Sequence, residues 1–527
     1  MSLLRNFATV GGATLSSRVL GFARDVMMAA ALGTGPVADA FVVAFRFPNL
    51  FRRLFAEGAF NSAFIPLFSR SLQGEGSQAE RRDAARAFAQ EAMAGLLTVL
   101  TLVCAVAMIA MPLLMLVLAP GFISDPDKFD LTVLLTRITM PYLALVSILA
   151  LMSGVLNGLG RFAAAAFAPV MLNVVLIAVL VAILGMGHAG SDQAGLWLAG
   201  GVLVGGVAQL MLVLVDLKRN GFWLKLVRPR WSDGMKRLVN LGIPGVIAGG
   251  VTQINIVVGT MIASMQAGAV SLLYYADRLY QLPLGVVGIA IGVVLLPELS
   301  RRLKAGDEAG VRITSARSLE FSMLLTLPAA VALAAIPIPL VSILFERGAF
   351  TQEARVGTAA ALQAFAIGLP AFVLIKVFSP AFFAREDTKT PMKVAALSVV
   401  VNVIASLALF PFLGHVGIAF ATSLAGWVNA LVLYQLILNR GYWRIERALF
   451  RKLIILLGCA ALMGVMLIAL ASWLEPFLAL STLLPVRLVA LGGLVMAGIV
   501  LFFGLAHASG AARLGDMKVM MTRRSAP

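Results

Sequence analysis

AAAAFAPVMLNVVLIAVLVAILG occupies residues 163–185 and contains no charged residue. An α-helix needs about 20 apolar residues to cross the hydrocarbon core of a membrane. Similar runs recur along the whole chain, and 60% of its 527 residues are hydrophobic, with a mean hydropathy of +0.96. A soluble domain could not bury that much apolar surface. We therefore predict an all-α polytopic membrane protein, because helices satisfy their own backbone hydrogen bonds in lipid.

The apolar runs predict about fourteen transmembrane helices. Their expected ranges are 8–32, 37–68, 88–119, 131–156, 163–185, 194–215, 238–266, 270–299, 318–345, 356–381, 393–411, 416–438, 452–474 and 486–507.

The lysines and arginines fall on alternate sides of this arrangement. One set of loops holds most of the 42 basic residues, whereas the opposite set holds only Lys128, Arg347, Arg355 and Arg487. Basic loops stay in the cytoplasm, so both termini are predicted to be cytoplasmic. The same distribution accounts for the net charge of +17 and argues against a nucleic-acid partner.

Landmarks in the first half of the chain recur in the second half at nearly one interval. The matched pairs are Pro66 with Pro297, Phe122 with Phe350, Pro141 with Pro370, and Asn173 with Asn402. We predict two six-helix lobes of like orientation, residues 1–220 and 221–440, with a solute path between them. Residues 441–527 then form two extra helices and a cytoplasmic tail.

The first two predicted helices carry an excess of positive charge inside the membrane. Their five arginines are Arg18, Arg24, Arg46, Arg52 and Arg53, and their three acids are Asp25, Asp39 and Glu57. A charge at the bilayer centre costs about 2.5–3.5 kcal/mol, so an unpaired arginine there indicates a wet cavity and an anionic ligand. Phosphate fits the guanidinium fork best.

Internal pairing is the competing interpretation of these charges. It would join Arg24 to Asp39, Arg53 to Glu57, and Arg278 to Asp277 in the second half. It cannot absorb all five arginines of the first two helices. We treat Asp25, Arg53, Asp277 and Lys376 as charge-pair or gating candidates, and Arg46 as snorkelling or paired with Asp39.

Six stretches, taken together and in order, resemble the MurJ/MviN family of lipid II flippases. They are RVLGFARD at 18–25, ADAF at 38–41, FPNLFRR at 47–53, AEGAF at 56–60, YYADRL at 274–279 and TKTP at 388–391. The family belongs to the superfamily of multidrug, oligosaccharidyl-lipid and polysaccharide exporters, and the resemblance runs through the last predicted helix.

The resemblance implies a two-lobe bundle whose cavity opens alternately to each side of the bacterial inner membrane. It implies that the protein flips lipid II, the precursor of the peptidoglycan cell wall, to the outer leaflet. The family's cavity arginines correspond to Arg18, Arg24, Arg52 and Arg278, expected to bind the pyrophosphate. Asp39, Asn49 and Glu57 also fall on cavity positions. The resemblance further implies that the last two helices hold the polyprenyl tail.

Several alternatives stay open from the sequence. A flippase for another polyprenyl-pyrophosphate glycan has the same electrostatic needs, whereas a drug/cation antiporter would meet a repulsive cavity. An intramembrane enzyme is disfavoured, because we find no nucleophile arrangement, metal cluster or phosphate-binding glycine loop. We expect no cofactor and no metal; some relatives bind sodium through an acid in the seventh helix, where this chain has Gln253 and Asn255. Besides lipid II and membrane lipids, cell-wall synthesis proteins are candidate partners.

Overall fold

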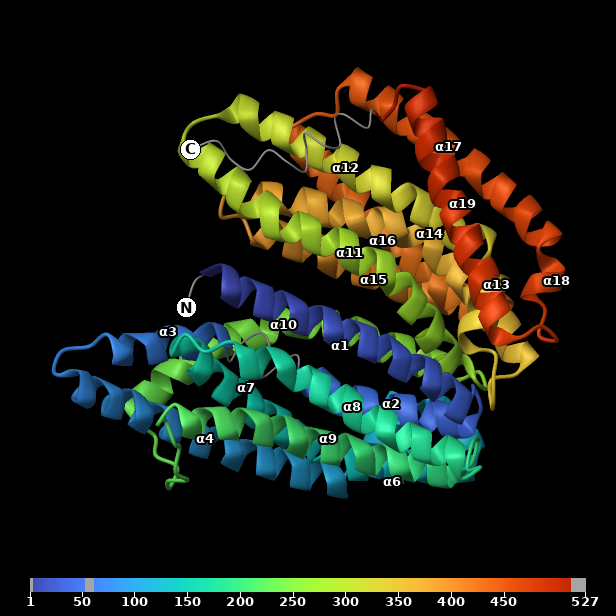
Figure 1. Cartoon of the computed structure of the whole chain (residues 1–527). Coiled ribbons are helices and arrows are strands. Elements are labelled where there is room, and N and C mark those ends of the chain that lie inside the picture. The colour runs from blue at the N-terminus through green and yellow to red at the C-terminus, as the bar shows by residue number, and fades with distance from the viewer. Residues whose placement is uncertain (1–2, 53–60, 513–527) are drawn as a thin grey trace. The chain divides into compact units, whose positions relative to one another are not determined.

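The computed structural model describes residues 3–52 and 61–512, and every regular element in these residues is a helix (Figure 1). The chain divides into two compact units. The first runs to Ser271 and also takes in the short segment Arg347–Thr351; the second comprises Leu272–Glu346 and the residues from Gln352 onward. The predicted boundaries at residues 220 and 440 describe a sequence repeat and stay predictions.

The first unit consists of ten α-helices and one short 3-10 helix within the described residues. They are α1 (Leu3–Leu32), α2 (Pro36–Arg52), α3 (Asn61–Leu72), α4 (Gln78–Ile109), α5 (Met111–Leu118), η2 (Pro120–Ser124), α6 (Pro126–Thr139), α7 (Tyr142–Gly158), α8 (Ala163–Gly185), α9 (Asp192–Arg219) and α10 (Asp233–Ser264).

The second unit holds nearly all of α11 and the helices that follow it. They are α11 (Ala269–Lys304), α12 (Glu308–Ala335), α13 (Pro337–Phe345), α14 (Gln352–Phe383), α15 (Lys389–Leu413), α16 (His415–Asn439), α17 (Arg447–Trp473), α18 (Glu475–Leu478) and α19 (Leu484–Ala508).

Prolines divide several of the predicted spans. The range 88–119 is α4 followed by α5 at Pro112, 131–156 is α6 and α7 around Pro141, and 318–345 is α12 and α13 at Pro337. Proline lacks the N–H that would continue the helical hydrogen bonding. Ten helices in the described residues are long and apolar enough to cross a membrane, so the chain is a multi-pass helical membrane protein. The count of fourteen stays a prediction.

Small residues set the spacing of the helices in the first unit. A Cβ at Gly205 of α9 would lie 2.5 Å from Cδ1 of Leu172 in α8, and one at Gly206 would lie 2.7 Å from Cδ2 of Tyr142 in α7. Membrane helices gain packing energy when glycine lets their backbones approach. α8 therefore lies in contact with both α9 and α1 (Figure 1).

The segment Arg347–Thr351 belongs to the first unit because it is fastened to the end of α1. The N–H of Ala349 donates to the carbonyl of Ala30 at 2.8 Å. The residue after α1 is Gly33, whose φ is +63° and whose Cβ, if present, would lie 2.2 Å from the carbonyl oxygen of Ala349. Only glycine fits this backbone angle and this close approach.

In the second unit, α14 contains Pro370, and side chains of α16 donate to two carbonyls of the turns before it. The hydroxyl of Ser423 donates to the carbonyl of Ala364 at 2.6 Å, and Nε1 of Trp427 donates to that of Ile367 at 2.9 Å. On another side, Gly464 lets α17 approach Val331 of α12. α12, α14, α16 and α17 thus share one apolar core.

Candidate functional site

Arg24 is held rigidly on α1. Its Nε and Nη2 both donate to Oδ1 of Asp25, at 3.1 and 2.7 Å, and its Nη1 donates to Oδ1 of Asn173 at 3.0 Å. The side chain of Arg24 is 13% exposed and that of Asp25 is 4% exposed. The acid that Arg24 pairs with is its chain neighbour, whereas Asp39 pairs with a lysine, as described below. A guanidinium fixed this way needs little reorganisation to meet an anion.

Asn173 is a site residue that sequence reasoning used only as a repeat landmark. Its amide nitrogen donates to the carbonyl of Ser17 at 3.0 Å while its oxygen accepts from Arg24, so α8 is tied to α1 at two points. Gly21 faces the same amide, since its Cβ would lie 3.6 Å from Nδ2 of Asn173. An uncharged asparagine inside an apolar run was the available signal, because such a group needs a partner in lipid.

Arg18 lies on the same helix and is exposed. Six residues at 1.5 Å each place it about 9 Å from Arg24 along the axis of α1. Among the described residues Arg18 forms no hydrogen bond or ion pair. It therefore keeps its full charge for a ligand, whereas the charge of Arg24 is offset in part by Asp25.

Arg52 and Asn49 form a second polar group, on α2. Nε of Arg52 donates to Oδ1 of Asn49 at 3.0 Å, and Nδ2 of Asn49 donates to the carbonyl of Phe45 at 2.7 Å. Pro48 cannot donate to the carbonyl of Ala44, and the hydroxyl of Thr139 in α6 donates there instead, at 2.9 Å. The proline thus removes one backbone hydrogen bond of the helix just before Arg52, and Thr139 keeps the carbonyl of Ala44 satisfied.

Two predicted residues, Arg53 and Glu57, lie outside the described residues, and their roles stay predictions. Arg46 lies on α2 within the described part of the chain. Its Nη1 donates to the hydroxyl of Thr260 in α10 at 3.2 Å.

Asp39 is fully buried, at 0% exposure, and its carboxylate accepts four hydrogen bonds. Nζ of Lys128 lies 2.7 Å from Oδ2, which also accepts from the N–H of Gly268 at 2.9 Å. Oδ1 accepts from the N–H and the hydroxyl of Ser271, at 2.9 and 2.7 Å. In this conformation Asp39 binds protein groups, and the sequence had placed Lys128 in an outer loop without a partner.

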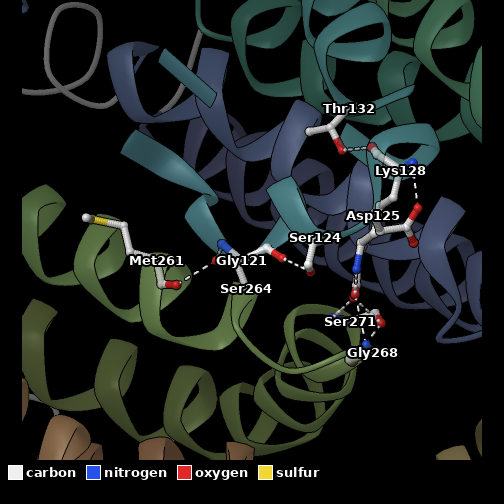
Figure 2. A network of polar contacts seen from close by, with 10 residues as sticks. Gly121, Ser124, Asp125, Lys128, Thr132, Met261, Ser264, Gly268 and Ser271 are labelled. Atoms are coloured by element: carbon white, nitrogen blue, oxygen red, sulfur yellow. Dashed lines mark hydrogen bonds and ion pairs between the residues drawn. The ribbon is translucent and has the colours of Figure 1, made fainter. Parts of the chain in front are cut away.

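The same network fastens the turn between α10 and α11 to Asp39 of α2 and to η2. Figure 2 shows Gly268 and Ser271 facing Lys128, with Ser264 facing Gly121 on the other side of the turn. The hydroxyl of Ser264 accepts from the N–H of Gly121 at 3.0 Å and donates to the carbonyl of Met261 at 2.6 Å. Any movement of this turn away from α2 and η2 would break both sets of bonds.

The second unit carries the remaining predicted site residues. The guanidinium of Arg278 lies over the ring of Tyr274, 4.5 Å from its centroid, and Asp277 accepts a hydrogen bond from Gln281. Lys376 is exposed, and its stem packs on Gly288, where an added Cβ would lie 2.9 Å from Cδ and Cε. An aromatic face thus helps to position Arg278.

A family model described as "Lipid II flippase MurJ" matches residues 28–488. The chain belongs to the MurJ family of lipid II flippases. It is 49% identical over 528 residues to a probable lipid II flippase MurJ of Rhizobium meliloti, covering 100% of this chain and 96% of that protein. It is 35% identical over 470 residues to the lipid II flippase MurJ of Burkholderia cenocepacia, covering 88% and 89%.

Solved structures show the same fold. A lipid II flippase MurJ in an inward closed conformation superposes with a TM-score of 0.76 at 23% identity, over 95% of this chain and 98% of that chain. An inward-facing multidrug resistance transporter of the MATE family gives a TM-score of 0.66 at 15% identity, over 80% and 94%. Membership of the MurJ family and the apolar helices make this chain a multi-pass inner-membrane protein of a transporter family.

Proposed function

We propose that this protein moves lipid II from the inner to the outer leaflet of the bacterial cytoplasmic membrane by alternating access through a cationic cavity. The observation that carries the proposal is the whole-length membership of the MurJ family. There is also a physical reason. The headgroup of lipid II is a pyrophosphate-linked glycopeptide, and it would lose its hydration, at a large cost in free energy, if it crossed the hydrocarbon core alone. Fixed guanidinium groups in a wet cavity replace that hydration.

The pyrophosphate is proposed to bind Arg18, Arg24, Arg52 and Arg278. Arg24 is oriented by Asp25 and Asn173, and Arg18 adds an exposed charge about 9 Å away on the same helix. Arg52 is oriented by Asn49. Arginine binds phosphate oxygens with two parallel hydrogen bonds, which favours it over lysine at such a site.

Asp39 is proposed to act in gating rather than in direct binding. Three of its four bonds hold the turn between α10 and α11 against α2, and the fourth joins α2 to Lys128 of α6. Moving the turn away from α2 would require the three bonds to break. Asp25, Arg53, Asp277 and Lys376 remain gating or charge-pair candidates, and Asn49 and Glu57 remain candidate substrate-binding residues.

The topology is part of the proposal. Both termini lie in the cytoplasm, about fourteen helices cross the membrane, and the first twelve form two lobes. An inside-negative potential of about 100 mV contributes about 2.3 kcal/mol per charge moved, which favours export of an anion. Cell-wall synthesis proteins that use lipid II are the proposed protein partners.

The test is complementation in cells depleted of their own lipid II flippase, with an assay of lipid II exposed on the outer leaflet. Arg18→Ala, Arg24→Ala, Arg52→Ala and Arg278→Ala are compared with wild type at matched membrane levels. Arg219→Ala, an exposed change at the end of α9, is the control. Wild type and control should restore growth and exposure, and the four variants should fail.

Two other outcomes would overturn the proposal. If the wild type inserts but restores neither growth nor exposure, the cavity serves another substrate, and polyprenyl-pyrophosphate glycans other than lipid II are the next candidates. If all four variants work, the arginines are structural and the binding site lies elsewhere.

A further inference from the structure

The second unit contains a cavity of about 570 Å³ lined by α12, α14, α16 and α17, and by Ile445 two residues before α17. Its lining is apolar except at Trp427 and Tyr434. Nε1 of Trp427 donates to the carbonyl of Ile367 at 2.9 Å, and the hydroxyl of Tyr434 accepts from the N–H of Ile445 at 3.1 Å. Because the polar atoms of Trp427 and Tyr434 already form hydrogen bonds within the protein, the cavity presents a mainly hydrocarbon surface to a ligand.

The cavity opens at the surface of the unit. Leu431 is 59% exposed, Ile454 is 54% exposed and Leu457 is 51% exposed, and all three line it. In a transmembrane helix bundle, an apolar surface of this kind faces lipid. Its natural occupant is therefore a hydrocarbon chain, because water gains no hydrogen bonds there.

The cavity is long and follows two helices that run in the same direction. Lys452, near the start of α17, forms an ion pair with Glu320 in the middle of α12, and farther along both helices Gly464 of α17 packs on Val331 of α12. On α12 the lining extends from Leu319 to Ala334, a rise of about 22 Å at 1.5 Å per residue. That compares with about 30 Å for the whole hydrocarbon core, so the cavity can hold one chain lying along the membrane normal.

Arginines mark the end at which the cavity begins. Arg447 lies one turn before Phe450 on the lining face of α17, Arg312 lies two turns before Leu319 on α12, and Arg444 adjoins Ile445. All three arginines are exposed. None has an ion-pair partner in the part of the chain that the structure describes. The three guanidinium groups suit the phosphate of an anionic lipid, and the apolar cavity beside them suits its hydrocarbon chain.

We propose that this cavity binds one acyl chain of an anionic phospholipid, whose phosphate is held by Arg312, Arg444 and Arg447. The lipid belongs to the leaflet at the starts of α12 and α17, which is the cytoplasmic leaflet in the topology proposed above. Basic clusters beside transmembrane helices attract anionic headgroups, and the guanidinium fork suits a phosphodiester.

The site is distinct from the proposed pyrophosphate site. The arginines assigned to the pyrophosphate lie on α1, α2 and α11, whereas the cavity is lined by other helices. The cavity shares α17 with the pair of helices expected to hold the polyprenyl tail, and a phospholipid bound here would stabilise the packing of α17 on α12 and α14.

The experiment uses the full-length protein in nanodiscs of phosphatidylcholine that contain a small fraction of phosphatidylglycerol with a diazirine in its acyl chain. After photolysis, labelled peptides are located by mass spectrometry. Label is expected on α12 between Leu319 and Ala334 and on α17 between Phe450 and Leu457. A matched probe of diazirine-bearing phosphatidylcholine is expected to label the same peptides much less.

Two variants and one control test the two ends of the lipid. Arg444→Gln/Arg447→Gln should reduce labelling about twenty-five-fold, if each arginine near the headgroup contributes about a factor of five. Lys218→Gln/Arg219→Gln removes the same charge from the exposed end of α9 and should change labelling less than twofold. Ala334→Phe partly fills the deep end and should move the label toward the cavity mouth.

Three results would overturn the proposal. One is labelling of the cavity peptides that is equal for both phospholipids, and another is labelling that the arginine pair does not affect. The third is displacement of the phosphatidylglycerol probe by unlabelled polyprenyl phosphate, which would assign the cavity to the substrate tail. That third result would leave the proposed flippase function intact.

Discussion

Replacing Lys128 by methionine should destabilise the first compact unit by about 3–5 kcal/mol, the usual cost of removing one partner of a buried ion pair. Lys128 is the cation that faces the fully buried carboxylate of Asp39, at 2.7 Å. The donors that remain, from Gly268 and Ser271, are neutral. Methionine keeps an unbranched stem on the ring of Phe122, where Nζ of Lys128 now lies 3.9 Å from the centroid, so charge is the main change.

The double variant Asp39→Asn/Lys128→Met separates a lost ion pair from a general packing defect. An amide in place of Asp39 keeps an oxygen that can accept from Ser271, and it needs no cation. The double variant should therefore be more stable than the sum of the two single effects by at least about 2 kcal/mol. A packing defect would instead give effects that add.

The assay is unfolding of the purified protein in mixed micelles by titration with SDS, followed by tryptophan emission. Lys218→Met, at the exposed end of α9, is the matched control and should stay within about 0.5 kcal/mol of wild type. The reasoning is refuted if Lys128→Met costs less than about 1 kcal/mol, or if the double variant is as unstable as the sum of the single ones.

Three further predictions concern other parts of the molecule. Asn173→Leu should leave membrane insertion intact but lower lipid II exposure in the complementation assay at least tenfold, because Arg24 loses a charge-assisted hydrogen bond of about 1.5–3 kcal/mol; equal exposure would contradict this. Gly33→Ala should lower the melting temperature, because its φ of +63° and the 2.2 Å approach to Ala349 leave no room for a methyl group; an unchanged melting curve would show that this close approach is absent. Hydrogen bonds from Arg440 and Thr390 hold the pKa of Asp387 well below its ordinary value of 3.8. The stability difference between wild type and Asp387→Asn should therefore be constant above that value and shrink as the pH falls below it; a difference that grows in acid would reverse the sign.

The positions of the helices could be predicted from the sequence because a membrane helix needs a long apolar run, and such runs are visible one residue at a time. The range predicted as 163–185 is α8, and 486–507 is nearly all of α19. The spans that prolines divide into two helices were harder to predict. Pro112, Pro141 and Pro337 are visible in the sequence, but proline is tolerated within membrane helices, as Pro370 is in α14. Neighbouring side chains decide which outcome occurs.

The candidate site also combines features that the sequence determined with features that only the tertiary structure decided. The sequence by itself determined that arginines enter the apolar part of the chain in excess of acids, because charge and hydropathy are properties of composition. It could not determine their partners. Asp25 and Asn173 around Arg24, and Lys128 around Asp39, were decided by the tertiary structure. A buried charge bonds to the donor or acceptor that the packing of distant helices brings within about 3 Å. Residue spacing along the chain does not predict which helices pack together, so it does not predict these partners.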